Sequence, residues 1–255
     1  MMLQDIFQTW GPILVQDFLR YLIAAGGVHL LVRALLAAGK SRRRLAPADP
    51  ARRQLRREFL WSLSTVAIFS LNGLMIHLLI QIGYIEIYTD PARHGYAHLG
   101  ASLVLILVAH DTYFYWTHRL LHRPALFARF HRLHHRSRHP SAFAAYSFHP
   151  VEAAIQAAFF PLFLLLVPTH VGIVLVFLTH MILRNALGHS GFEFYPAGAP
   201  DRPSWRRLTS TTHHHLHHER GSGNFGLYFT WWDRLMGTER HDYRERFARV
   251  TDGAA

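Results

Sequence analysis

Long apolar segments dominate this chain and limit what it can fold into. They run from about Pro12 to Ala38, from Phe59 to Tyr84, from Ala97 to Tyr115 and, in one longer block, from Val151 to Leu187. About 20 apolar residues are enough for a helix to cross a bilayer. Pro168 interrupts the last block, which favours two short helices joined as a hairpin. The pattern predicts an all-α, multi-pass integral membrane bundle of three transmembrane helices and a helical hairpin.

The distribution of charge predicts the orientation of this bundle. The formal net charge is +11, and much of the excess is arginine between Lys40 and Arg57, a connection between two apolar segments. Membrane proteins concentrate Lys and Arg in their cytoplasmic loops. We therefore expect the N-terminus outside and the residues after Thr117 on the cytoplasmic side. No aromatic and basic binding motif accompanies the charge, so we expect no nucleic-acid partner.

The chain shows no fixed repeat and no linker to a separate soluble domain. We expect one membrane domain over residues 1–255, with the N-terminal helices and the basic loop in 1–100. Its first residues, MMLQDIFQTW, have neither a basic region nor a small-residue cleavage site. They are expected to begin the first membrane segment rather than a removed signal peptide.

Histidines on the predicted cytoplasmic side occur in spaced groups. The groups are an HxxxH at His118 and His122, two HxxHH motifs at His131, His134 and His135 and at His214, His217 and His218, and an NxxxH at Asn185 and His189. Residues at i, i+3 and i+4 share one face of a helix, so each group would point its side chains into one volume. So many candidate ligands exceed what one metal ion can hold, which predicts a two-metal centre in a cytoplasmic, histidine-rich helical cap.

Prolines indicate the helix boundaries around these motifs. The third apolar segment can continue as a helix through His122 until Pro124. A further helix is expected to begin at Pro124 and to end before Pro140, carrying the first HxxHH.

Other interpretations of the histidines stay open at this point. THHHLHH alone could be a loose metal-binding tract. Two transmembrane histidines could hold haem axially, as in a b-type cytochrome. Six other histidines are expected to be ordinary surface or satisfied core residues: His29, His77, His94, His98, His139 and His170.

The residue types around the groups favour iron. The chain has no cysteine, which excludes disulfides, Cys-ligated zinc, iron–sulfur clusters and Cys nucleophiles. Carboxylates are few nearby, unlike the Glu-x-x-His di-iron bundles, and HExxH is absent. An all-nitrogen two-metal centre in a membrane points to iron and dioxygen, although zinc occupancy stays open.

These motifs resemble the fatty acid hydroxylase/sterol desaturase superfamily over roughly His110 to Thr238. The matching stretches are HDTYFYWTHRLLH, FHRLHH, SAFAAYSFHPVEA, NALGH, and THHHLHHERGSGNFG with WWDRLMGT. The segment from His131 to Glu152 is most similar to the sterol C5-desaturase branch. The resemblance implies that residues 101–240 are the catalytic region and that it holds a di-iron centre.

Carried over residue by residue, the resemblance implies nine ligands: His118, His122, His131, His134, His135, His189, His214, His217 and His218. Further candidates, to bind metal or to orient ligands, are Asn185, His149, Asp111, His110, His213 and His215. Asn185 stands where many relatives have histidine. Tyr113 and Trp116 are expected to support ligands, and Asn224 and Gly226 to shape a turn near the site.

The implied function is a membrane-bound, non-haem di-iron oxidoreductase. With two iron ions and O2 as co-substrate, it would hydroxylate or desaturate a sterol-like or fatty acyl lipid. Electrons would come from an external ferredoxin or b-type cytochrome with its reductase. Phe159, Phe160, Phe163 and Phe177 could wall an apolar tunnel from the bilayer to the metals, or they could belong to ordinary lipid-facing helices. The alternatives are a non-catalytic membrane metal binder or transporter, and a carotenoid or ether-lipid oxygenase of the same superfamily.

Overall fold

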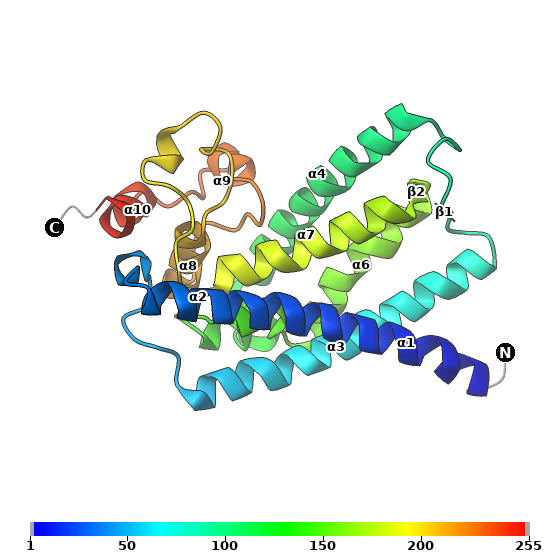
Figure 1. Cartoon of the computed structure of the whole chain (residues 1–255), viewed down its shortest axis with the longest axis horizontal. Coiled ribbons are helices and arrows are strands. Elements are labelled where there is room, and N and C mark those ends of the chain that lie inside the picture. Colours follow the sequence, from blue (N-terminus) through cyan, green and yellow to red (C-terminus); the bar gives the residue numbers. More distant parts are fainter. Residues whose placement is uncertain (1–2, 253–255) are drawn as a thin grey trace.

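The computed structural model describes residues 3–252, and helices account for most of it (Figure 1). The long apolar elements are α1 (Leu3–Tyr21), η1 (Leu22–Gly26), α2 (Gly27–Ala37), α3 (Arg52–Gln81), α4 (Tyr96–Leu121), α6 (Pro150–Leu166) and α7 (Val171–His189). Four helices are long and apolar enough to cross a membrane, namely Ile6–Ala37, α3, α4 and α7, and α6 is a shorter apolar helix. The prediction of a helical membrane protein is confirmed. The extreme ends of the predicted domain, residues 1–2 and 253–255, lie outside the described range.

The first segment is one helix that passes through a π turn. The turn, η1, joins α1 to α2 without a break in helical backbone. Tyr21 precedes it and is fully buried, where its hydroxyl donates a hydrogen bond to the Phe143 carbonyl at 3.1 Å. The turn therefore brings the N-terminal helix against the short 3-10 helix η5 (Ala142–Tyr146), which lies beside the histidines described below.

The last apolar block forms the predicted hairpin, broken where Pro168 interrupts it. Helix α6 ends at Leu166, and the strand β2 (Thr169–His170) precedes α7. β2 pairs in parallel with β1 (Ile87–Tyr88), in the connection between α3 and α4. The hairpin therefore extends to the end of the bundle where α3 and α4 are joined (Figure 1).

Apolar side chains pack between the helices and also cover their outer faces. One buried cluster lies among α3, α4, α6 and α7, and it includes Ile106, Phe163 and Phe177. On the outside, Leu30 and Leu166 remain 69% and 83% exposed. Large apolar side chains are expected on outer faces that contact lipid rather than water.

The polar end of the bundle carries the short elements. They are η2 (Ser41–Arg43), α5 (Pro124–Leu126), η3 (Phe127–His131), η4 (His134–Arg136), η5, η6 (Ala199–Asp201), α8 (Thr211–Arg220), α9 (Trp231–Leu235) and α10 (Tyr243–Thr251). The basic connection after α2 packs here, because Leu45 N donates to the Gly191 carbonyl at 2.9 Å and Arg43 to that of Tyr195 at 2.6 Å. The fold thus places the basic loop and the C-terminal elements at one end (Figure 1).

The first HxxHH motif does not lie on one α-helix, and that expectation is wrong. A helix begins at Pro124 as predicted, but it becomes the π helix η3, and the chain turns before the 3-10 helix η4. By contrast, α4 ends at Leu121 with His122 as its C-cap, as the prolines predicted. The three imidazoles of this motif lie in two volumes rather than one, His131 and His135 in the first and His134 in the second.

Candidate metal centre

The nine histidines carried over as ligands lie together in two buried groups. Within each group, one ring nitrogen per residue lies within 4.8 Å of the others. The first group contains His118, His122, His131, His135 and His217, and the second contains His134, His189, His214 and His218. Both HxxHH motifs contribute to both groups, because α8 also directs His217 to the first group and His214 and His218 to the second.

Hydrogen bonds at Nδ1 fix the protonation of five of these rings. Each Nδ1 faces a backbone carbonyl: His118 that of Phe225 at 2.9 Å, His134 that of Ser147 at 3.3 Å, His189 that of Asn185 at 2.8 Å, His217 that of Gly223 at 2.8 Å and His218 that of Ser137 at 3.1 Å. A carbonyl oxygen only accepts, so Nδ1 must carry the proton and Nε2 must present a lone pair.

The Nε2 atoms of the second group face one another at hydrogen-bond distance. His189 Nε2 lies 3.2 Å from that of His134, and 3.1 Å from that of His218. Since these three rings are protonated at Nδ1, no hydrogen joins them, and facing lone pairs repel. A cation between them removes the repulsion, so the donor set of this group fits a metal ion.

The first group shows the same convergence. His135 Nε2 lies 3.1 Å from the Nε2 atoms of both His131 and His217. His122 Nε2 is buried and has no hydrogen-bond partner within residues 3–252. Five and four converging nitrogens do not leave room for a porphyrin, which takes its protein ligands only along one axis. Two separate metal ions fit this arrangement and haem does not.

Burial keeps these imidazoles neutral. Desolvation, followed by the neighbouring histidines, lowers the pKa of His122 to about 2 and that of His135 to about 3. The same causes hold the pKa of five further ligands well below its usual value: His131, His134, His214, His217 and His218. Neutral imidazole is the form that binds metal, so no proton has to be removed near pH 7.

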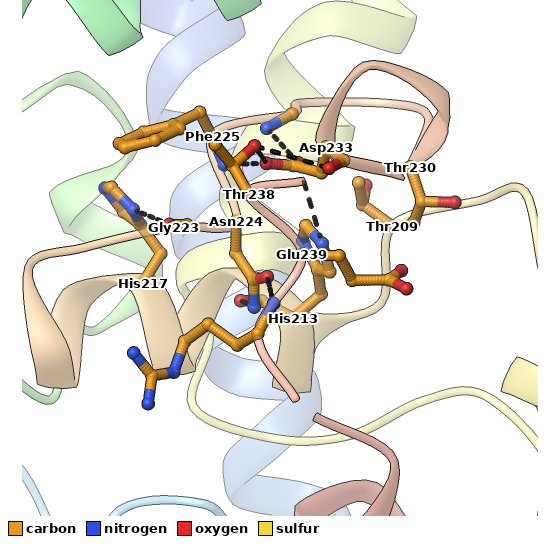
Figure 2. Close-up of polar contacts among 12 residues, drawn as sticks. Thr209, His213, His217, Gly223, Asn224, Phe225, Thr230, Asp233, Thr238 and Glu239 are labelled. Carbon is orange, nitrogen blue, oxygen red and sulfur yellow. Dashed lines mark hydrogen bonds and ion pairs between the residues drawn. The ribbon is translucent and has the colours of Figure 1, made fainter. Parts of the chain in front are cut away.

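The loop after α8 positions ligands of the first group (Figure 2). Asp233 accepts hydrogen bonds from the backbone amides of Phe225 and Gly226, at 2.9 and 2.8 Å. Asn224, with φ 54°, donates through its side chain to the His213 carbonyl at 2.9 Å. These contacts hold in place the carbonyl groups of Phe225 and Gly223 that bind His118 and His217. The turn predicted at Asn224 and Gly226 is therefore present.

Three of the further candidates lie beside the ligands but make other contacts. Asp111 accepts from the backbone amide of Tyr228 at 2.7 Å, and His110 Nδ1 lies 2.9 Å from the hydroxyl of the same tyrosine. Asn185 donates through its side chain to the Ala145 carbonyl at 2.6 Å. These residues join α4 and α7 to the segments that surround the two groups.

The remaining candidates lie outside both groups as well. His149 is the N-cap of α6, where its Nδ1 accepts from Val151 N at 3.2 Å. His213 is fully buried, with Nε2 3.7 Å from Asp233 Oδ2. His215 Nε2 lies 3.0 Å from Nδ1 of His139.

Glu152 is a functional candidate that the histidine spacing did not reveal. Its Oε1 lies 2.8 Å from His131 Nδ1, and both side chains are buried. The available signal was a lone carboxylate at the start of an otherwise apolar helix, because such a residue needs a polar partner. Its carboxylate occupies the position at Nδ1 of His131 that backbone carbonyls occupy at Nδ1 of five other proposed ligands.

An apolar cavity of about 280 Å³ lies among α1, α3, α6 and α7. Of the predicted wall residues, Phe159, Phe160 and Phe177 line it, whereas Phe163 is buried in the core. On the side of the histidines, the lining includes Phe114, Phe148, Asn185 and Leu227. The ring of Phe114 is 5.0 Å from that of His118, and the ring of Phe148 is 5.1 Å from that of His134. The cavity therefore ends one side chain away from both groups.

The fold and the site together define a helical membrane protein with two buried histidine groups suited to metal ions. The model of the fatty acid hydroxylase family matches residues 103–238, and the chain belongs to that family.

Similar curated proteins include sterol desaturases and a sterol monooxygenase. The chain is 30% identical to Delta(7)-sterol 5(6)-desaturase ERG3B of Gibberella zeae, over 73% of this chain and 56% of that protein. It is 31% identical to lathosterol oxidase of Mus musculus, over 74% of this chain and 62% of that protein. It is 32% identical to methylsterol monooxygenase 1 of Rattus norvegicus, over 56% of this chain and 48% of that protein.

These relatives confirm the predicted likeness to the sterol C5-desaturase branch. The matched region spans only about three fifths of the first two relatives' length. No solved structure shows a significant match to this chain.

Proposed function

We propose that this protein is a non-haem di-iron oxidoreductase that uses O2 to hydroxylate or desaturate a sterol-like lipid in the membrane. The observation that carries this proposal is the convergence of ring nitrogens into two buried groups of five and four histidines, in which five rings carry their proton at Nδ1 and so present an unprotonated Nε2. The nine predicted histidines would hold one iron ion in each group. When bound, the two ions would supply the activation of O2 that oxidation of an unactivated lipid carbon requires.

The residues of the chain would hold the centre and keep it dry. Nδ1 hydrogen bonds to backbone carbonyls orient the rings before any metal binds, which lowers the cost of assembling the site. The ligands are buried or nearly so, with His122 the most accessible of the nine. Phe114 and Phe148 separate the cavity from the histidines and would exclude water from the space between lipid and metal.

The cavity supports a lipid substrate that carries a polar group. Three polar atoms of its lining are buried without a hydrogen-bond partner in the described part of the chain: Arg20 Nε, Tyr146 Oη and Gln156 Oε1. Buried polar atoms are normally paired, so a ligand group that pairs them would bind favourably. A hydroxyl group satisfies both donors and acceptors. A sterol-like alcohol therefore suits this cavity better than a plain hydrocarbon does, in keeping with the substrates named in the relatives.

Electrons would come from a separate protein. Complete reduction of O2 takes four electrons, of which the lipid supplies two, so a donor must deliver the other two. The chain has no cysteine for an iron–sulfur cluster, and the external donor would be a ferredoxin or a b-type cytochrome with its reductase. The basic loop after α2 lies at the histidine end, which supports a cytoplasmic active site and offers an acidic donor a docking surface.

Lipid profiling of cells with and without the full-length protein tests the proposal. A product heavier by one oxygen indicates hydroxylation, and a product lighter by two hydrogens indicates desaturation. The mass of the parent lipid identifies its class, including a carotenoid or an ether lipid. Cells that produce the His217→Ala variant serve as the matched control.

Purified protein separates an enzyme from a metal carrier. We expect two iron ions per chain and O2 consumption that depends on both the donor and the lipid. Iron binding without O2 consumption and without any altered lipid would contradict the proposal and favour a non-catalytic metal binder or transporter.

A further inference from the structure

A third group of metal-ligating side chains lies outside the two histidine groups. It consists of His139, His215 and Glu219, whose ligand atoms lie within 4.8 Å of one another. His139 Nδ1 and His215 Nε2 are 3.0 Å apart. None of these three residues belongs to either of the two groups proposed to hold iron.

The contacts of this third group leave polar atoms unpaired. His215 is only 1% exposed, and its second ring nitrogen, Nδ1, has no hydrogen-bond partner among the described residues. Oε2 of Glu219 is also buried and lacks a hydrogen bond within residues 3–252. Arg246 Nη2 lies 3.7 Å from that oxygen, too far for a hydrogen bond. A buried carboxylate oxygen in this state indicates a missing partner.

The backbone holds these side chains in a geometry that a metal ion can use. His215 and Glu219 are four residues apart on α8, so they share one face of the helix. This face is turned about 100° from the one that carries His214 and His218. His139 comes from the segment after η4, the 3-10 helix that carries the proposed iron ligands His134 and His135.

We propose that His139, His215 and Glu219 form a third, mononuclear site for a divalent transition-metal ion of the zinc class. Two imidazoles and one carboxylate are a ligand set that zinc accepts, with water in the remaining position. The mixed nitrogen and oxygen donors distinguish this site from the all-nitrogen groups beside it. The bound ion would connect the segment after η4 to α8. Three of the nine proposed iron ligands lie on α8, and three more lie in η3 and η4, just before that segment.

Two pockets other than the lipid cavity adjoin this site. Glu219 lines a pocket of about 260 Å³ together with Arg246, and His139 lines another of about 40 Å³. The guanidinium of Arg246 is the competing cation at Glu219. It is weakly held, because its Nη2 makes only a long hydrogen bond of 3.4 Å to the Leu45 carbonyl and its buried Nε has no partner among the residues described. A metal ion bound at closer range would displace it from the carboxylate.

Zinc uptake by the purified, iron-loaded protein tests the third site. The full-length protein in detergent is incubated with a small excess of Zn²⁺, passed through a desalting column and analysed for both metals. The variants are His139→Gln and Glu219→Gln, and the matched control is His241→Gln, which changes an exposed histidine. We expect the wild type and the control to retain one more zinc ion per chain than either variant, with equal iron in all four proteins.

Equal zinc in the wild type and both variants overturns the proposal. The test compares the zinc content of the wild type with that of the variants, so its result holds even if the two histidine groups contain a metal other than iron. Should a variant lose iron as well, X-ray absorption at the zinc K edge of the wild type decides. Two imidazoles together with oxygen ligands support the third site, whereas four or five imidazoles, or water alone, overturn it.

Discussion

His131 Nδ1 lies 2.8 Å from Glu152 Oε1, and this contact joins a ligand of the first histidine group to the first turn of the membrane hairpin. Both side chains are almost fully buried. Carboxylate partners of this kind fix the orientation of a metal-binding imidazole and raise its basicity. Glu152 therefore links the packing of α6 to the geometry of the proposed metal centre.

Replacing this carboxylate should weaken metal binding without removing a ligand. We expect Glu152→Gln to lower the affinity for iron about 10- to 100-fold, the range typical of such partners. The amide keeps the size of the side chain and one acceptor oxygen but loses the charge. Iron retained during dialysis against a graded chelator measures the effect. Glu86→Gln, in the connection before β1, is the control and should match the wild type.

Neighbouring histidines on α8 should affect different metal ions. His217 belongs to the first group and His218 to the second. We expect His217→Ala and His218→Ala each to abolish lipid oxidation and to lose one of the two irons. His149→Ala removes only the N-cap of α6, at a cost of about 0.5–2 kcal/mol, and should keep both irons. If His149→Ala lost iron as His217→Ala does, the ligand assignment would be wrong.

The metal-free protein should become less stable in mild acid. The folded-state pKa of His122 is about 2 and that of His135 about 3, whereas an unfolded histidine titrates near 6.5. Between these values unfolding takes up protons, so stability falls as pH decreases below about 6.5. We expect the thermal midpoint in detergent to drop from pH 7.5 to pH 5 and to be flat above pH 7.5. A midpoint independent of pH over the lower interval would contradict the neutral, buried histidines.

Gly226 should not tolerate a side chain. A Cβ atom there would lie 2.4 Å from the Phe229 carbonyl oxygen and 3.0 Å from Asp233 Oδ2. We expect Gly226→Ala to cost about 1–3 kcal/mol or more, as overpacking does, and to lower iron retention because the loop holds His118 and His217. Gly100→Ala is the control: its Cβ meets nothing within 4 Å, and alanine favours the interior of α4 by about 1 kcal/mol. Unfolding midpoints of both variants give the comparison.

The Tyr146 hydroxyl should affect the binding of substrate rather than the stability of the fold. It lies buried in the cavity lining and has no hydrogen-bond partner within the described chain. We expect Tyr146→Phe to raise KM up to about tenfold, the effect of one hydrogen bond, and to leave the unfolding midpoint unchanged. Tyr84→Phe, at an exposed tyrosine, should change neither quantity. An unchanged KM for Tyr146→Phe would remove the support for a polar group of the lipid at this position.

The sequence alone determined the membrane helices and the identity of the proposed ligands. Helix boundaries at His122 and at Pro168 follow from proline chemistry and from apolar length, which are local properties. The spacing of the histidines also survives in the structure, since all nine lie in the two groups.

Only the tertiary structure decided how these ligands are divided and supported. Both HxxHH motifs are divided between the two groups, the first across π and 3-10 turns and the second on the single helix α8, whereas the spacing had predicted one shared volume for each motif. Glu152, Asp233 and His139 reach their partners across 21, 8 and 76 residues of sequence. Such contacts depend on how elements that are separated in the sequence pack together. The order of the residues alone does not reveal this packing.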